Sequence, residues 1–133
     1  MTQIQEMAAK IRHAYDQFPK GDVETFARLF GDSAVMIEAD SLPYGGSHKG
    51  YEGVKAALID IVTKWFSEIS FDIRDFLIGE NHVAAYGRLT AVSKTSGEKI
   101  NFPLAEVWHI ENGKVLSMTP IYFDTSATAY ILR

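Results

Sequence analysis

Cysteine is absent from this chain of 133 residues, and so is any excess of positive charge. Without thiols, the protein forms neither a disulfide nor a thiolate metal site, and the redox state of its compartment stays open. The 13 Lys and Arg residues are scattered and are outnumbered by 17 Asp and Glu, which leaves a net charge of -4. We therefore expect no basic patch of the kind that binds nucleic acid.

Long apolar runs are also missing. No segment approaches the ~18 consecutive apolar residues that a membrane-spanning helix needs. Residues 1–15, "MTQIQEMAAKIRHAY", place their apolar residues at helical spacing and lack the apolar core of a signal peptide. We therefore expect no membrane partner and a cytoplasmic location.

Sequence motifs for common cofactors are not found either. The glycine-rich segment 44–53, "YGGSHKGYEG", lacks the G-x-G-x-x-G spacing of a phosphate-binding loop, and the four histidines lack metal-ligand spacing. Its glycines are typical of a tight turn, where a positive φ angle or a close approach excludes a side chain. We expect no metal and no nucleotide, and hence no cofactor.

The sequence does contain enough apolar material for one domain over residues 1–133, since 47% of it is hydrophobic. Apolar residues recur at helical spacing in three segments of the first half, 4–18, 23–30 and 54–65. Between the second and third, "SAVMIEA" has the composition of a strand and ends on the carboxylate of Glu38.

The second half consists of strand patterns separated by turn signals, among them the hairpin sequence Asn112-Gly113. Helices that precede a strand meander predict an α+β fold. Gly87 and Pro103 allow strands to bend, which favours a curved antiparallel β-sheet over a flat one. With three N-terminal helices packed on it, such a sheet forms a cone-like half barrel whose open end suits a small apolar ligand.

Several segments, taken in order, resemble the SnoaL-like, ketosteroid isomerase-related proteins of the nuclear transport factor 2-like superfamily. They are "GDVETFARLF", the strand that ends at Glu38, "LPYGG", "KGYEGV", "VWHIENGKV" and "YFDT". The similarity runs from about Ile11 to Leu132 and implies the cystatin-like architecture of that superfamily. It implies no single activity, because members include isomerases, cyclases, hydrolases, dehydratases and noncatalytic binders.

The resemblance to ketosteroid isomerase implies roles for individual residues. Glu38 falls at the position of the catalytic base, and Tyr15 at that of a tyrosine in the oxyanion hole. The second acid of that hole has no counterpart: Ala105 occupies its position, with Glu106 beside it. Asp124 is comparable to an acid/base residue of the related polyketide cyclases. The implied chemistry is cofactor-free proton transfer next to a carbonyl, with Glu38 as base and Tyr15, Glu106 and Asp124 as candidate donors.

Each candidate also has a purely structural interpretation. Glu38 is inside an apolar cavity, where burial raises its pKa, or is a solvated carboxylate at the strand end, or forms a salt bridge to Lys49 or Arg88. Tyr15 is expected to be buried, and a buried hydroxyl needs a hydrogen-bond partner whatever its role. Asp124 would serve equally well as the N-cap of a C-terminal helix.

Glu106 shares a strand face with Leu104 and Trp108, and this is either the cavity face or an outer face used for dimerisation. If Leu104, Trp108 and Ile110 are exposed there, a homodimer is expected. Further candidates, as lining of a ligand cavity or as ordinary core, are Tyr44, Trp65, Phe66, Tyr86, Met118 and Tyr122.

Three functions remain open from the sequence. The first is an isomerase or lyase acting on a small apolar or carbonyl-bearing molecule. The second is a noncatalytic domain that binds a hydrophobic ligand or dimerises, and the third is a hydrolase or dehydratase in which an acid activates water.

Overall fold

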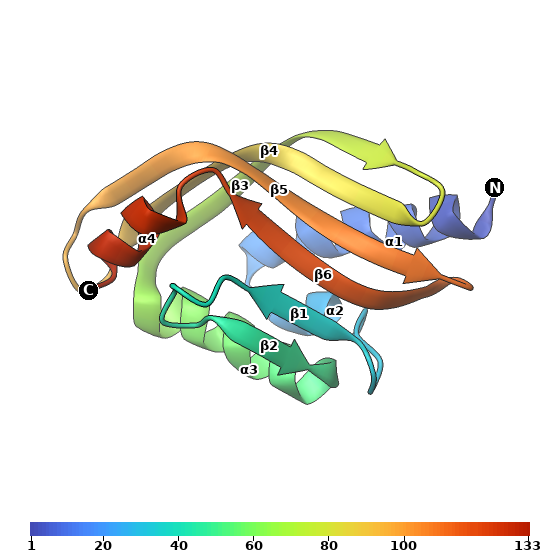
Figure 1. Cartoon of the computed structure of the whole chain (residues 1–133), viewed down its shortest axis with the longest axis horizontal. Coiled ribbons are helices and arrows are strands. Elements are labelled where there is room, and N and C mark those ends of the chain that lie inside the picture. Colours follow the sequence, from blue (N-terminus) through green and yellow to red (C-terminus); the bar gives the residue numbers. More distant parts are fainter.

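The computed structural model describes residues 1–133, and its first part folds into helices that lie against one face of a sheet (Figure 1). Helix α1, Gln3–Gln17, begins with the expected capping box, in which Thr2 and Gln5 exchange hydrogen bonds. A 3₁₀ turn, η1 (Phe18–Lys20), leads to helix α2, Val23–Ala27. Helix α3, Gly50–Asp60, continues into a π-helical turn, η2 (Ile61–Trp65). No helix is long and apolar enough to cross a membrane.

Six strands form one curved sheet that does not close on itself, in the order β2-β1-β6-β5-β4-β3 (Figure 1). Their bounds are β1 Val35–Glu38, β2 Gly46–Lys49, β3 Phe66–Ile78, β4 His82–Ser93, β5 Lys99–Glu111 and β6 Lys114–Tyr122. Strands β3 to β6 form the expected antiparallel meander, whereas β1 runs parallel to β6. The predicted α+β fold is confirmed. The short strand β2 was not expected, because its sequence, "GSHK", lies in the segment interpreted as a turn.

The bend of the sheet depends on Gly87 in β4. Opposite it, β3 has an irregularity in register between Ile73 and Asp75. A Cβ atom on Gly87 would lie 2.0 Å from the carbonyl oxygen of Asp72, so only glycine allows the two strands to approach this closely. The bulge and the glycine together turn β3 over the helices.

Helices and sheet enclose the apolar core. Trp108, Phe30 and Met118 are almost wholly buried between α1, α2, α3 and the sheet. Leu104, Trp108 and Ile110 are 4%, 0% and 3% exposed. Of the two alternatives for this face, the exposed outer face is therefore wrong and the cavity face is correct, because strand alternation places these residues on the concave side that the helices cover.

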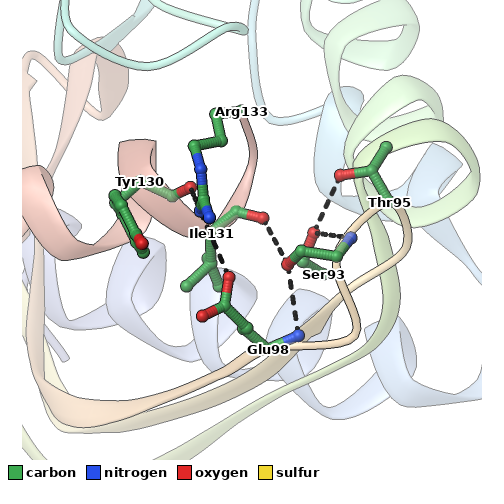
Figure 2. Close-up of polar contacts among 7 residues, drawn as sticks. Ser93, Thr95, Glu98, Tyr130, Ile131 and Arg133 are labelled. Carbon is green, nitrogen blue, oxygen red and sulfur yellow. Dashed lines mark hydrogen bonds and ion pairs between the residues drawn. The ribbon is translucent and has the colours of Figure 1, made fainter.

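A short C-terminal helix, α4 (Thr125–Ile131), is fastened to the turn between β4 and β5 (Figure 2). The Ser96 hydroxyl donates to the carbonyl of Ile131 at 2.7 Å, and Arg133 pairs with Glu98 at 3.2 Å. The hydroxyls of Ser93, at the end of β4, and Thr95, in the turn, are hydrogen-bonded to each other at 3.1 Å. These contacts hold α4 against the end of the sheet, where Ile131 packs into the core.

Replacing Gly87 with Ala tests the close approach of β3 and β4. We expect the free energy of unfolding to fall by about 2–4 kcal/mol, because the new methyl group meets backbone atoms that cannot move independently. Urea unfolding followed by circular dichroism measures this loss. Gly31→Ala is the matched control, since a Cβ there meets nothing within 4 Å. Equal stabilities of the two variants would contradict the packing described.

Candidate functional site

A cavity of about 220 Å³ lies between the concave face of the sheet and helices α1, α2 and α3. Of its 17 lining residues, 12 are hydrophobic, among them Phe18, Phe26 and Phe71. Strands β1, β3, β4, β5 and β6 all contribute to the wall. Three lining residues are acids, and none is Lys, Arg or His. The cavity is therefore apolar, with acidic groups that have no basic neighbour in its wall.

Glu38 is one of these acids and stands at the end of β1. It is only 5% exposed, because the parallel pairing of β1 with β6 turns the Met36–Glu38 face inward. Its Oε1 atom is buried without a hydrogen-bond partner. Burial, and then the carboxyl of Glu106, raise the pKa of Glu38 to about 8, against a smaller opposing effect of the Tyr122 hydroxyl. Glu38 is thus a carboxyl group that keeps its proton near neutral pH.

Glu106, from β5, lines the same cavity and belongs to a hydrogen-bonded chain. The Tyr15 hydroxyl donates to Glu106 Oε1 at 2.7 Å, and Trp108 Nε1 donates to the Tyr15 oxygen at 3.0 Å. Desolvation raises the pKa of Glu106 to about 7, partly offset by the hydrogen bond from Tyr15. Burial, together with the charge of Glu106, raises the pKa of Tyr15 well above its usual value, so this phenol stays protonated as a donor.

A pair of phenols, Tyr44 and Tyr122, lies beside Glu38. The hydroxyls of Tyr44 and Tyr122 are 2.9 Å apart, and Tyr122 lines the cavity. Tyr44 belongs to "LPYGG" and is 5% exposed, so it forms part of the interior beside the cavity wall. Gly45 follows it at a point where a Cβ would lie 2.3 Å from the carbonyl of Ala39. The glycines of this loop thus allow the tight turn that carries Tyr44 inward.

The structure brings some of the sequence-predicted site residues together and leaves others apart. Glu38, Tyr15, Glu106, Met118 and Tyr122 all line the cavity. The other five do not line it: Tyr44, Trp65, Phe66, Tyr86 and Asp124.

These five have other positions in the fold. Asp124 caps α4 by accepting a hydrogen bond from the amide of Ala127 at 2.9 Å. Tyr86 is 44% exposed, at a position of β4 whose side chain points away from the helices. Phe66 packs in the core, and Trp65 lies beside Lys64 at the end of η2.

One polar member of the site, Trp108, was not identified as such from the sequence. Strand alternation showed that Trp108 shares a face with Glu106. Only the tertiary structure shows that the indole N–H of Trp108 donates a hydrogen bond to the Tyr15 hydroxyl. The aromatic wall formed by Phe18, Phe26 and Phe71 was missed as well. Helical spacing marks Phe18 and Phe26 as apolar, but core and cavity residues have the same pattern.

The side chains do not form a metal-binding site. No group of three or more His, Asp or Glu side chains lies close enough together to hold an ion. The chemistry available to the cavity residues themselves is proton transfer and hydrogen bonding by two carboxyls and their phenol neighbours.

Glu38→Gln tests the protonation of the buried acid. In the folded protein the pKa of Glu38 is raised from 4.5 to about 8, so the resulting stability is present below pH 4.5 and is lost as the pH rises towards 8. Gln has no proton to lose. We expect the variant to be more stable than the parent by roughly 2–4 kcal/mol above pH 8, with a much smaller difference below pH 5.

Urea unfolding at a series of pH values measures this difference, and Glu68→Gln, at an exposed position of β3, is the control. A stability difference that does not change with pH would mean that Glu38 ionises as freely in the folded protein as in the unfolded chain.

Comparisons with known proteins agree with this architecture. A family model described as the SnoaL-like domain matches residues 11–118. The search of curated proteins found no match. Among solved structures, Bal32a from a soil-derived mobile gene cassette is 22% identical with a TM-score of 0.86, and the match covers 99% of this chain and 100% of that one.

Two further structures have the same fold. An NTF2-like protein from Burkholderia thailandensis is 16% identical with a TM-score of 0.85, over 100% of this chain and 99% of the other. TerC, co-crystallised with polyporic acid, is 19% identical with a TM-score of 0.79, over 98% of each chain. At these identities the structures establish the fold alone, whereas the family model covers most of the sequence. The chain therefore belongs to the SnoaL-like domain family.

Proposed function

We propose that this protein binds a small carbonyl-bearing molecule in the cavity and transfers a proton at the carbon next to the carbonyl. The observation that carries the proposal is the presence of two acids, Glu38 and Glu106, in one small apolar cavity. The pKa of Glu38 is about 8 and that of Glu106 is about 7, and both values suit general acid–base catalysis near neutral pH. Such a reaction needs neither a metal nor a nucleotide.

The size of the cavity narrows the proposed substrate. Its volume of about 220 Å³ lies below the ~300–1,000 Å³ that is usual for sites of drug-sized ligands. A molecule with one or two rings fits this volume better than a four-ring steroid does. The aromatic wall offers stacking surface to such rings. The co-crystal of TerC with polyporic acid supports small-molecule binding by this fold.

The acid–base proposal is tested with β-tetralone, a two-ring ketone, in deuterium oxide. We expect the protein to accelerate exchange of the protons next to the carbonyl, measured by NMR. Glu38→Leu and Glu106→Leu should each slow the exchange about a hundredfold or more, because each removes one proton-handling group. Glu68→Gln should leave it unchanged.

The alternative functions predict other results. Binding of β-tetralone without any proton exchange would mean that the protein is a noncatalytic binding domain and not an enzyme. The absence of both binding and exchange would contradict the proposal.

We also propose that two copies associate through the outer face of the sheet. Four large apolar side chains are exposed on or beside it: Leu77 at 54%, Tyr86 at 44%, Ile121 at 56% and Phe123 at 76%. Tyr86, Ala105 and Ile121 lie next to one another across β4, β5 and β6. Exposed apolar side chains that adjoin across neighbouring strands, as Tyr86 and Ile121 do on either side of Ala105, are typical of an interface.

Sedimentation at micromolar concentration tests the association. We expect the parent to sediment as a dimer and Ile121→Lys to sediment as a monomer, because a charge in the middle of an apolar interface loses its hydration on association. Leu116→Lys, at an exposed position nearer the start of β6, is the control and should remain dimeric. A monomeric parent would contradict the proposed interface.

A further inference from the structure

The two cavity acids differ in the hydrogen-bond donors that reach them. Glu106 accepts from the Tyr15 hydroxyl at 2.7 Å, and Tyr15 in turn accepts from Trp108 at 3.0 Å. Trp108 is fully buried, and Tyr15 packs edge-on against its ring and that of Phe26, so this chain of donors is held in place. Hydrogen bonds donated to a carboxyl oxygen stabilise the ionised form of the carboxyl group.

Glu38 has weaker support from donors, since the Tyr122 hydroxyl opposes only a small part of the rise in its pKa. Its Oε1 atom is buried without a partner, and the nearest phenols, Tyr44 and Tyr122, are bonded to each other. No Lys, Arg or His lines the cavity, so nothing there compensates a second negative charge. A buried carboxyl with one oxygen left without a partner is far less costly as the neutral acid than as the anion. In that form it has a proton of its own to donate.

We propose that the two acids have roles opposite to those implied by the resemblance to ketosteroid isomerase: Glu106 is the anionic base, and Glu38 is the neutral acid that donates a hydrogen bond to the carbonyl oxygen of the substrate. This assignment rests on the proposed function. It concerns which acid performs which part of the reaction in that same cavity.

The electrostatics of the cavity agree with this assignment. Burial raises the pKa of both acids, to about 7 for Glu106, where the Tyr15 hydrogen bond opposes the rise, and to about 8 for Glu38, where the charge of Glu106 adds to it. The titratable groups facing Glu38 are Tyr44, Tyr122 and Glu106: the two phenols stay protonated, Tyr122 lowers the pKa of Glu38 slightly by a hydrogen bond, and the charge of Glu106 raises it. The third acid of the wall, Asp72, is paired with Arg74. Between about pH 7 and pH 8 the pair therefore titrates through a singly protonated state, and in the proposed assignment that proton is on Glu38.

The proton-transfer step balances with these two residues alone. The carboxylate of Glu106 takes the proton from the carbon next to the carbonyl, so a C–H bond breaks and an O–H bond forms on Glu106. The electron pair of the C–H bond moves into the enolate, whose negative charge collects on the carbonyl oxygen. The proton of Glu38 stabilises that oxygen through a hydrogen bond. Return of the proton from Glu106 to the same or another carbon of the enolate regenerates the carboxylate.

Protonation of the free protein tests the assignment without any substrate. Protein labelled with ¹³C in the glutamate carboxyls is titrated by NMR, and the two cavity signals are assigned by their loss in Glu38→Gln and Glu106→Gln. We expect the Glu38 signal to be that of a neutral acid at pH 7.5 and the Glu106 signal to belong to the group that ionises first. A neutral Glu106 beside an ionised Glu38 would overturn the proposal.

Exchange of β-tetralone protons in the same two variants supplies a second readout. Gln at position 38 keeps an N–H donor of similar shape, so we expect a loss of about tenfold or less. The rate of the parent should fall above pH 8 as Glu38 ionises, and this fall should be absent from Glu38→Gln. Gln at position 106 cannot accept a proton, so we expect a loss of about a hundredfold or more. Equal losses, or the larger loss in Glu38→Gln, would overturn the assignment.

Failure of the proposed function is distinguishable from failure of the assignment. A parent protein that neither binds nor exchanges β-tetralone contradicts the function, whereas the NMR titration still decides which acid is neutral. Exchange by the parent combined with the reverse order of variants leaves the function intact and refutes the assignment alone.

Discussion

The architecture of this protein is organised around an electrostatic constraint: the carboxyl groups of Glu38 and Glu106 share an apolar cavity that has no basic residue in its wall. Two like charges this deeply desolvated are unfavourable, so at most one of them ionises near neutral pH. Most buried acids in proteins are neutralised by Arg, Lys or a metal ion. Here the charge is limited by a retained proton and by phenol and indole donors, which is an arrangement suited to moving protons rather than to stabilising a fold.

The fold supplies the positions that this constraint requires. Parallel pairing of β1 with β6 carries Glu38 from the N-terminal half of the chain to the wall formed by the meander. Alternation along β5 places Glu106 and Trp108 on the concave face, and α1 brings Tyr15 across to meet both. The bend at Gly87 turns β3 over the same space. Each acid therefore comes from a different strand, and the cavity exists only in the fully folded sheet.

Much of the fold was predictable from the sequence, because its signals are local. The capping box at Thr2, the helical periodicity of the first half and the turn at Asn112-Gly113 depend on neighbouring residues only. The resemblance to SnoaL-like proteins pointed to Glu38 and Tyr15, and both line the cavity. The sequence left open whether Leu104, Trp108 and Ile110 face the cavity or the outside, because alternation reveals two faces of a strand but not which one the helices will cover.

What the sequence could not provide was the pairing of donors with acceptors. Tyr15 and Glu106 are 91 residues apart, and Trp108 reaches Tyr15 across a similar separation. Ala105 suggested that the second acid of the site was missing, whereas the structure places Glu106 in the cavity one residue further along the strand. The curvature and register of the sheet decide which of these two residues faces the cavity, since a shift of one residue exchanges the two faces of a strand.

Infrared spectroscopy of the unliganded protein in deuterium oxide tests the central claim most directly, because protonated and ionised carboxyls absorb at different frequencies. Near neutral pH the account predicts a band from a buried protonated carboxyl, which disappears as the pH is raised through about 8. A spectrum with every carboxyl ionised at neutral pH would contradict it, since the two acids would then be solvated or paired in a way that the cavity does not provide.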